Sequence, residues 1–297
     1  MKRREFVTLL AGAAAWPFPA HGEDQPAPDP AAGSHVGQVA TVKGSATVSR
    51  AAAAGALLKV KDAILRHDIL ETAADGALGV TFDDETTFSL SANTRIVVDQ
   101  YIFQEGGKAN AALFRVTQGT AAFVANLVAR TGDMKVATPT ASLGIRGTTG
   151  VIDVPTSGAT AGQPTIKLYA DADGHVGRIE VFDLQGASLG ALSRGASAFT
   201  IRPGAGGRLT AVPYQIPPAE LTRDRGVLQR LVSSHTIGRR LLIQQRQLRP
   251  GNLKMPNNTV SPPKTNLRSL NQPPKGNLRL PTAPKIKVPK INEPNIR

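Results

Sequence analysis

Residues 77–90 read ALGVTFDDETTFSL, and this stretch shows the pattern that decides the fold of most of the chain. Leu78, Val80 and Phe82 alternate with small or polar residues, so in an extended strand their side chains point to one face. A second alternating segment, residues 87–90, follows an acidic turn. Two short alternating segments around a turn predict a β-hairpin with one buried face.

Similar segments recur on both sides of this hairpin, from residue 36 to about residue 209. Gly, Asp or Asn separates them about every 8–12 residues, a spacing typical of all-β folds. The sequence therefore predicts a mainly β domain, a sandwich, barrel or solenoid of many short strands. Residues 166–169 and 178–182 are expected to pair as a hairpin, and residues 156–215 to extend the same β body or to form a small separate domain.

Several motifs in this region occur in the order found in FecR domains. They are KDAI at 61–64, DILET at 68–72, FDDET at 82–86, FRVTQG at 114–119 and ATPTASLGIRGT at 137–148. The chain therefore resembles the FecR domain, and we place this domain at residues 35–155. The resemblance implies a β-rich periplasmic domain of the iron-citrate regulator type, which relays a signal from an outer-membrane receptor to a sigma factor.

Two turn positions depart from the FecR pattern. Lys61 and Glu85 stand where the family usually has glycine, so we expect looser turns there. Only residues 1–5 precede the first apolar run. The cytoplasmic segment with which such regulators reach a sigma factor is therefore expected to be missing. From the resemblance we expect the β domain and its binding to a partner, and not the regulation of a sigma factor.

The first 22 residues have the plan of a signal peptide. Three basic residues, 2–4, precede an apolar run at 6–15, and small residues at 20 and 22 suit cleavage near Gly22. The run of ten residues would span roughly 15 Å as a helix, about half of a hydrocarbon core of ~30 Å, so a membrane anchor is disfavoured. The arginine pair favours a twin-arginine signal, with a general secretory signal as the alternative. We therefore predict a periplasmic protein in which residues 23–34 form a linker.

Charge and cysteine content narrow the function classes. Residues 216–297 contain 16 Lys and Arg against 3 Asp and Glu, so the whole net charge of +13 lies in this last part of the chain. A neutral body with a cationic end suits contact with polyanions. The chain has no cysteine, which excludes disulfides, thiolate zinc sites and cysteine nucleophiles.

Residues 216–248 predict a basic helix. Pro217 and Pro218 followed by Glu220 suit a helix start, and leucine and valine residues then recur at helical spacing. Arg239 and Arg240 lie near its end and are candidate partner-binding residues. Two placements remain open, with the helix packed on the β body or lying on an anionic membrane surface.

Residues 249–297 predict a disordered tail. Ten prolines and ten Lys and Arg stand there with one acid, a composition that cannot build a core. A loose Asn-Leu-basic repeat marks Lys254, Arg268 and Arg279 as candidate contacts for an anionic glycan or lipid surface. The absence of Phe, Tyr and Trp from residue 216 onward leaves no base-stacking side chain, so nucleic acid is not expected. A solubilising tail without a partner is the alternative.

Three segments match catalytic or metal-binding patterns only in part. Residues 186–190 fit G-x-S-x-G, but strands rather than a strand and a helix flank them, so we interpret them as a turn. Residues 171–174 lack the rest of a calcium loop and are interpreted in the same way. The acids at 83–85 are expected to be solvated at a hairpin tip. We therefore predict no enzyme, no metal and no cofactor.

Arg146 is the remaining candidate within the β body. It stands between Gly144 and Gly147, in a segment expected to form tight turns. Either it pairs with a carboxylate such as Asp62 or Asp84 and fixes a turn, or it contacts a partner or ligand. The sequence thus favours a periplasmic binding or scaffold protein that recognises an envelope protein or glycan, with an envelope-sensing signal-transduction component as the alternative.

Overall fold

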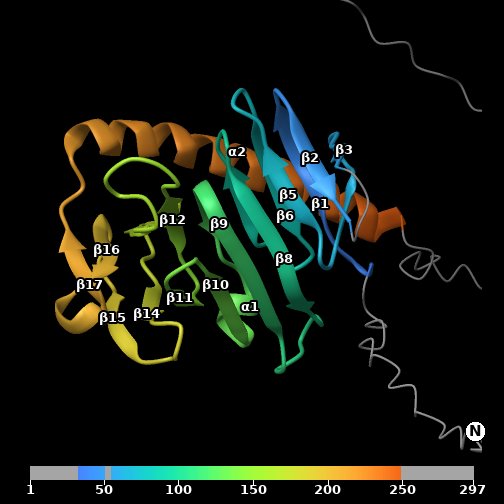
Figure 1. Cartoon of the computed structure of the whole chain (residues 1–297). Coiled ribbons are helices and arrows are strands. Elements are labelled where there is room, and N and C mark those ends of the chain that lie inside the picture. Colours follow the sequence, from blue (N-terminus) through green and yellow to red (C-terminus); the bar gives the residue numbers. More distant parts are fainter. Residues whose placement is uncertain (1–32, 51–54, 249–297) are drawn as a thin grey trace, which may run out of the picture. The chain divides into compact units, whose positions relative to one another are not determined.

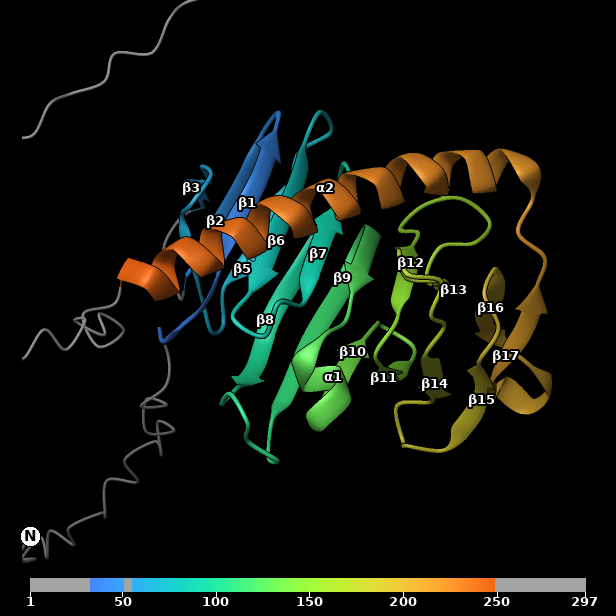
Figure 2. The same ribbon diagram turned by 180° about the vertical axis from the view of Figure 1, so that it is seen from behind.

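The computed structural model describes residues 33–50 and 55–248. In these residues two stacked β-sheets enclose the hydrophobic core, and the long helix α2 lies across the outer face of one sheet (Figures 1 and 2). The predicted mainly β fold followed by a helix is confirmed. The predicted signal peptide, most of the predicted linker and the predicted tail lie outside the described residues.

The sheet that carries α2 is called sheet A. From one edge to the other it contains β4 (Ala63–Leu65), β1 (His35–Lys43), β6 (Ala77–Phe82), β7 (Thr87–Leu90), the C-terminal part of β9 (Ala111–Val124), β12 (Thr149–Val154), β13 (Thr165–Tyr169), β16 (Ser197–Pro203) and β17 (Leu209–Tyr214). All of these pairs are antiparallel.

The second sheet is called sheet B. In order it contains β3 (Ala56–Leu57), β2 (Ala46–Ser49), β5 (Ile69–Thr72), β8 (Arg95–Ile102), the N-terminal part of β9, β10 (Asp133–Ala137), β11 (Ser142–Arg146), β14 (Arg178–Phe182) and β15 (Ser188–Leu192). Only the β9–β10 pair is parallel, and the short helix α1 (Leu127–Thr131) makes this connection. A turn of 3₁₀ helix, Ala205–Gly207, joins β16 to β17, and α2 spans Pro218–Leu248.

Strand β9 belongs to both sheets. Its residues 111–118 pair with β8 in sheet B, and its residues 119–124 pair with β12 in sheet A. Gly119 marks the change with a φ of 80°, and a Cβ there would lie 2.5 Å from Thr94 Oγ1. Glycine is therefore required where the strand leaves one layer for the other.

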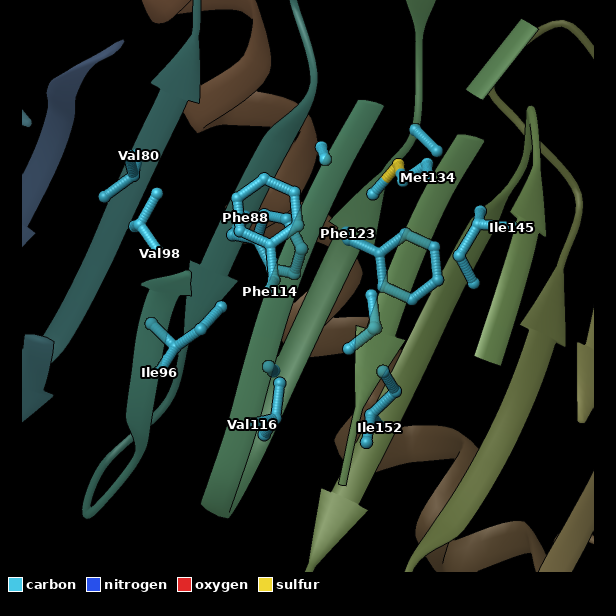
Figure 3. Packing of buried hydrophobic residues seen from close by; sticks show 14 of the residues in the cluster. Val80, Phe88, Ile96, Val98, Phe114, Val116, Phe123, Met134, Ile145 and Ile152 are labelled. Carbon is cyan, nitrogen blue, oxygen red and sulfur yellow. The ribbon is translucent and has the colours of Figure 1, made fainter. Parts of the chain in front are cut away.

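The core fills the space between the two sheets, as the alternating pattern predicts. Leu78, Val80 and Phe82 are buried, and the aromatic rings gather near β9 (Figure 3). The ring centroid of Phe114 lies 4.8 Å from that of Phe82 and 4.7 Å from that of Phe88. Tilted rings at such spacing add to the stabilisation from buried area.

The predicted hairpin of residues 166–169 and 178–182 is wrong. Strand β13 pairs with β12 and β16 in sheet A, whereas β14 pairs with β11 and β15 in sheet B. A tight turn does follow β13, with the Gly174 N–H donating to the Asp171 carbonyl at 2.9 Å. The chain then crosses between the layers, which alternation along one strand cannot reveal. The hairpins of this region are β14–β15 and β16–β17.

The looser turns expected at Lys61 and Glu85 are not observed. Both residues keep the positive φ that glycine would adopt, 76° and 68°. The turns are closed by backbone hydrogen bonds, from Asp62 N–H to Lys59 O at 3.1 Å and from Glu85 N–H to Phe82 O at 2.9 Å. The protein therefore keeps the tight turns and tolerates strained backbone at both positions.

Replacing Lys61 by glycine is expected to raise the free energy of unfolding by about 1 kcal/mol, because glycine adopts a positive φ without steric cost. Urea denaturation of the full chain measures the effect. Lys59→Gly, two residues earlier and not at a positive φ, serves as the control and is expected to lower stability by roughly 0.5–1 kcal/mol. If both variants lose the same free energy of unfolding, the backbone at Lys61 is not strained.

Candidate functional site

Helix α2 packs on the strip of sheet A whose side chains are small or polar. The Oγ atom of Ser234 lies 2.7 Å from Thr41 Oγ1, directly above Gly79. A Cβ on Gly79 would come within 2.1 Å of Ser234 Oγ, and a Cβ on Gly238 within 1.9 Å of Thr81 Oγ1. Two glycines, one on each element, thus allow the helix to approach the sheet closely.

Of the two placements that the sequence left open for this helix, the structure shows packing on the β body. Its buried face crosses β1, β6, β7 and β9 (Figure 2). The apolar part of the contact includes Val227 and Leu231 against Ala122 and Val151, and Leu241 and Leu242 are also buried on α2. Polar contacts between α2 and the sheet accompany this apolar face.

The largest of these contacts is a buried ion cluster around Lys167 of β13. The Lys167 side chain is fully buried, and its Nζ lies 2.6 Å from Asp153 Oδ2. Two acids of the first turns of α2 complete the shell, Glu220 at 2.7 Å and Asp224 at 2.8 Å. Because the acids are four residues apart, they lie on one face of the helix, towards the sheet.

Two tyrosines close the cluster. Tyr169 donates its hydroxyl hydrogen bond to Asp224 Oδ2 at 2.7 Å, and Tyr214 donates to Glu220 Oε2 at 2.6 Å. Arg223 lies at the outer side, 3.0 Å from Glu220. The cluster thus joins β12, β13, β17 and the start of α2.

The pKa values of the cluster favour its charged form. Burial alone would lower the pKa of Lys167, but Asp153 and the two helix carboxylates outweigh it, and the pKa is raised. Burial alone would raise the pKa of Glu220, whereas hydrogen bonds from Lys167 and Tyr214 leave it lowered. A nucleophilic lysine needs a lowered pKa, so this lysine serves as an ionic clamp.

Sequence reasoning missed this clamp. In the segment TIKLY, residues 165–169, Lys167 alternates with Ile166 and Leu168 and therefore points away from the core. Alternation alone would place it in solvent. Only the acidic pair at 220 and 224, on the otherwise basic helix, was a signal that a cation is buried beneath it.

The expectation of solvated acids at residues 83–85 is wrong for Asp84, which is fully buried. Its carboxylate accepts hydrogen bonds from Tyr101 Oη at 3.0 Å, from Thr86 Oγ1 at 2.6 Å and from the Val128 N–H at 3.1 Å. Burial raises the pKa of Asp84 despite these donors. Asp84 therefore ties the β6–β7 turn to β8 and to α1.

The candidate arginines of α2 have different surroundings. Arg239 forms an ion pair with Glu85 at 3.0 Å and so helps to hold the helix on the β6–β7 turn. Burial and the neighbouring Arg239 lower the pKa of His235, which lies 3.1 Å from Thr87 Oγ1 through its Nδ1. Arg240 is exposed on the outer side of the helix. Lys254, Arg268 and Arg279 lie outside the described residues.

Arg146 does not fix a turn through a carboxylate. It is exposed at the end of β11 and donates to the Gly132 carbonyl at 3.1 Å. Asp62 instead accepts from the Lys59 N–H, and Asp84 is enclosed in its own network. The expected pairing of Arg146 with Asp62 or Asp84 is therefore wrong, because both acids bond to their own turns.

The partial catalytic and metal patterns lie in turns, as interpreted. Gly186 has a φ of 88° in the turn between β14 and β15, and a strand rather than a helix begins at Ser188. The Asp171 side chain accepts from Thr149 Oγ1 at 2.6 Å. Across residues 33–50 and 55–248, no group of three or more His, Asp or Glu is arranged to hold a metal ion. Nor does any helix in these ranges combine the length and apolar character of a membrane span.

Comparisons with known proteins agree with the sequence resemblance. Residues 68–166 match the family described as FecR protein. A crystal structure of a candidate anti-sigma factor from Parabacteroides distasonis is similar, with 14% identity and a TM-score of 0.37 over 50% of this chain and 60% of that chain. A second such structure from this organism has 12% identity and a TM-score of 0.36 over 55% of this chain and 74% of the other.

No curated protein matches the sequence of the chain. The family match begins just before β5, includes the Asp84 network and Arg146, and ends within β13. Residues 68–166 of this chain are therefore a FecR domain.

Proposed function

We propose that this chain is a non-catalytic FecR-domain protein of the periplasm that binds an envelope partner through its β-sandwich. The observation that carries the proposal is the FecR match, which includes β6, β7 and β9 beneath α2. The buried charged side chains support it. Lys167 is neutralised by three carboxylates, and Asp84 is saturated with donors, so neither is presented to a substrate.

The outer surface of α2 suits binding to an acidic partner. Both acids of this helix point into the Lys167 cluster, so its outward charge is contributed by arginines such as Arg225 and Arg240. The tail that follows adds ten Lys and Arg with one acid. We propose that the tail tethers the protein to an anionic glycan or lipid surface.

A second candidate function is a signal-transduction component that senses an envelope state. The FecR match favours it, because the resemblance to regulators of the iron-citrate type implies the relay of a signal from an outer-membrane receptor. In this case the β-sandwich would bind a protein that itself continues the signal. The two functions predict different results when the partner is deleted. Gene expression changes if the chain is a signalling component and stays the same if it is a binding protein.

Site-specific photocrosslinking in cells tests partner binding. A photoreactive residue is placed in the full chain at Arg240, at Arg146 or, as a control, at Leu184, which is 58% exposed on the tip of the β14–β15 turn. One envelope protein captured repeatedly from Arg240 or Arg146, and not from Leu184, is the expected result. Equal labelling from all three positions would overturn specific recognition.

The contribution of the tail is tested with a chain that ends at Leu248, the last residue of α2. Ending the chain at Gln215 would also remove Glu220 and Asp224 and leave Lys167 exposed without two of its partners. We expect the shorter chain to retain the protein crosslink and to lose sedimentation with anionic vesicles. Loss of the protein crosslink as well would assign recognition to the tail.

A further inference from the structure

Three arginines lie near one another where β11 ends. Arg146 at the end of β11 stands directly opposite Arg178 at the start of β14. Arg130 extends from α1 along the residue that follows Arg146, and its Cγ and Nε would lie 3.3 and 3.5 Å from a Cβ on Gly147. Like charges opposite each other on neighbouring strands destabilise a sheet, so this arrangement needs an explanation.

The carboxylates of the described residues neutralise only one of the three. Arg178 pairs with Glu180 at 3.1 Å. Arg146 donates to a neutral carbonyl, that of Gly132, and in residues 33–50 and 55–248 neither Arg146 nor Arg130 forms an ion pair with an acid. Two guanidinium groups that line the same cavity, and that have no carboxylate partner among the described residues, suit an anion.

These two arginines line one cavity of about 490 Å³. The other lining residues are Ala129, Gly147, Asp173 and His175. Asp173 accepts a hydrogen bond from the His175 N–H at 3.0 Å through Oδ1, and its Oδ2 has no hydrogen-bond donor among the described residues. The volume lies within the range of about 300–1,000 Å³ found for small-ligand sites, and the cavity is broadly open to solvent, as a site for one unit of a longer chain must be.

The two arginines and Asp173 together limit the chemical class of ligand that fits the cavity. The guanidinium pair suits a carboxylate, to which arginine can donate two parallel hydrogen bonds. Asp173 repels a second carboxylate, so a run of acidic residues fits poorly, but it accepts hydrogen bonds from hydroxyl groups. A ligand that carries one carboxylate and several hydroxyls satisfies both sides of the cavity.

We propose that this cavity binds a uronic acid unit of an acidic polysaccharide, with the carboxylate at Arg130 and Arg146 and ring hydroxyls at Asp173. The inference rests on the proposed function and adds a polysaccharide to the envelope partners of the same β-sandwich. It also accounts for Arg146, which lies in the FecR match and has no carboxylate partner among the described residues.

The test measures trigalacturonate binding to the full chain by calorimetry at physiological salt, with galactose as the neutral sugar. Arg146→Gln and Arg130→Gln remove one guanidinium each and are expected to weaken binding at least about tenfold, because each loses charge-assisted hydrogen bonds. Arg208→Gln is the matched control. It removes an exposed arginine that precedes β17, leaves the cavity and the basic tail intact, and should leave the affinity unchanged.

Four results would overturn the inference. Trigalacturonate binding that all three variants keep would place the sugar on the tail. Acetate or phosphate that binds as tightly as the sugar would reduce the cavity to a general anion site, and a tetra-aspartate peptide that binds more tightly would indicate a protein ligand. If photocrosslinking still captures the envelope protein while trigalacturonate fails to bind, the proposed function stands and only the sugar assignment falls.

Discussion

Lys167→Met lowers the free energy of unfolding by about 3–5 kcal/mol, the cost expected when a buried ion cluster loses its only fully enclosed cation. Three carboxylates, those of Asp153, Glu220 and Asp224, would then face one another with only Arg223 at the outer side. Methionine preserves most of the volume of lysine, so the loss reports charge rather than packing. Urea denaturation of the full chain gives the measurement.

The matched control is Lys135→Met. Lys135 also lies on a strand and pairs with an acid, Asp133, at 2.7 Å, but its side chain is half exposed. Exposed pairs contribute about 0–1 kcal/mol, so this variant should be nearly as stable as the parent. If both variants lose the same stability, Lys167 does not clamp α2. Amide hydrogen exchange of the Lys167→Met variant locates the effect, because the first turns of α2 should lose their protection from exchange first.

Gly238→Ala and Gly226→Ala, the same change in the same helix, are expected to have opposite effects. Alanine at Gly226 meets only the Arg230 guanidinium at 3.9 Å and should stabilise the helix by about 0.5–1 kcal/mol. Alanine at Gly238 would lie 1.9 Å from Thr81 Oγ1 and 2.4 Å from Thr81 Cβ. The helix must shift away from β6, so we expect a net loss of about 1–3 kcal/mol.

Thermal unfolding of both variants checks the opposite signs. A second change tests the cause, because Thr81→Gly removes the three atoms that lie nearest to the new Cβ. The double variant Gly238→Ala, Thr81→Gly should be more stable than Thr81→Gly alone. The prediction fails if Gly238→Ala raises stability in the parent, since α2 would then not rest on the sheet at this point.

The fold class could be predicted from the sequence because burial of one strand face leaves a period of two. The alternation at Leu78, Val80 and Phe82 names the core face correctly. It says nothing about the other face, which in this protein is also buried, beneath α2. Thr81 and Lys167 look like solvent-facing residues for this reason, although both are fully buried.

The candidate site was less accessible to sequence reasoning, because its contacts join residues far apart in the chain. Lys167 and Asp224 are separated by 57 positions, and Asp84 and Val128 by 44. Single-sequence patterns extend over one turn or one hairpin. Arg146 illustrates the same limit, since its position opposite Arg178 follows from the β11–β14 pairing and from nothing local.

The passage of β9 through both sheets has a mechanical consequence. In aligned sandwiches the two layers meet through interdigitated side chains, which are not hydrogen-bonded main chain. Here one continuous strand is hydrogen-bonded in both layers, to β8 and β10 in one and to β7 and β12 in the other. Sliding would require main-chain bonds on either side of Gly119 to break together. A pulling force applied to one sheet is therefore transmitted through β9 to the other sheet.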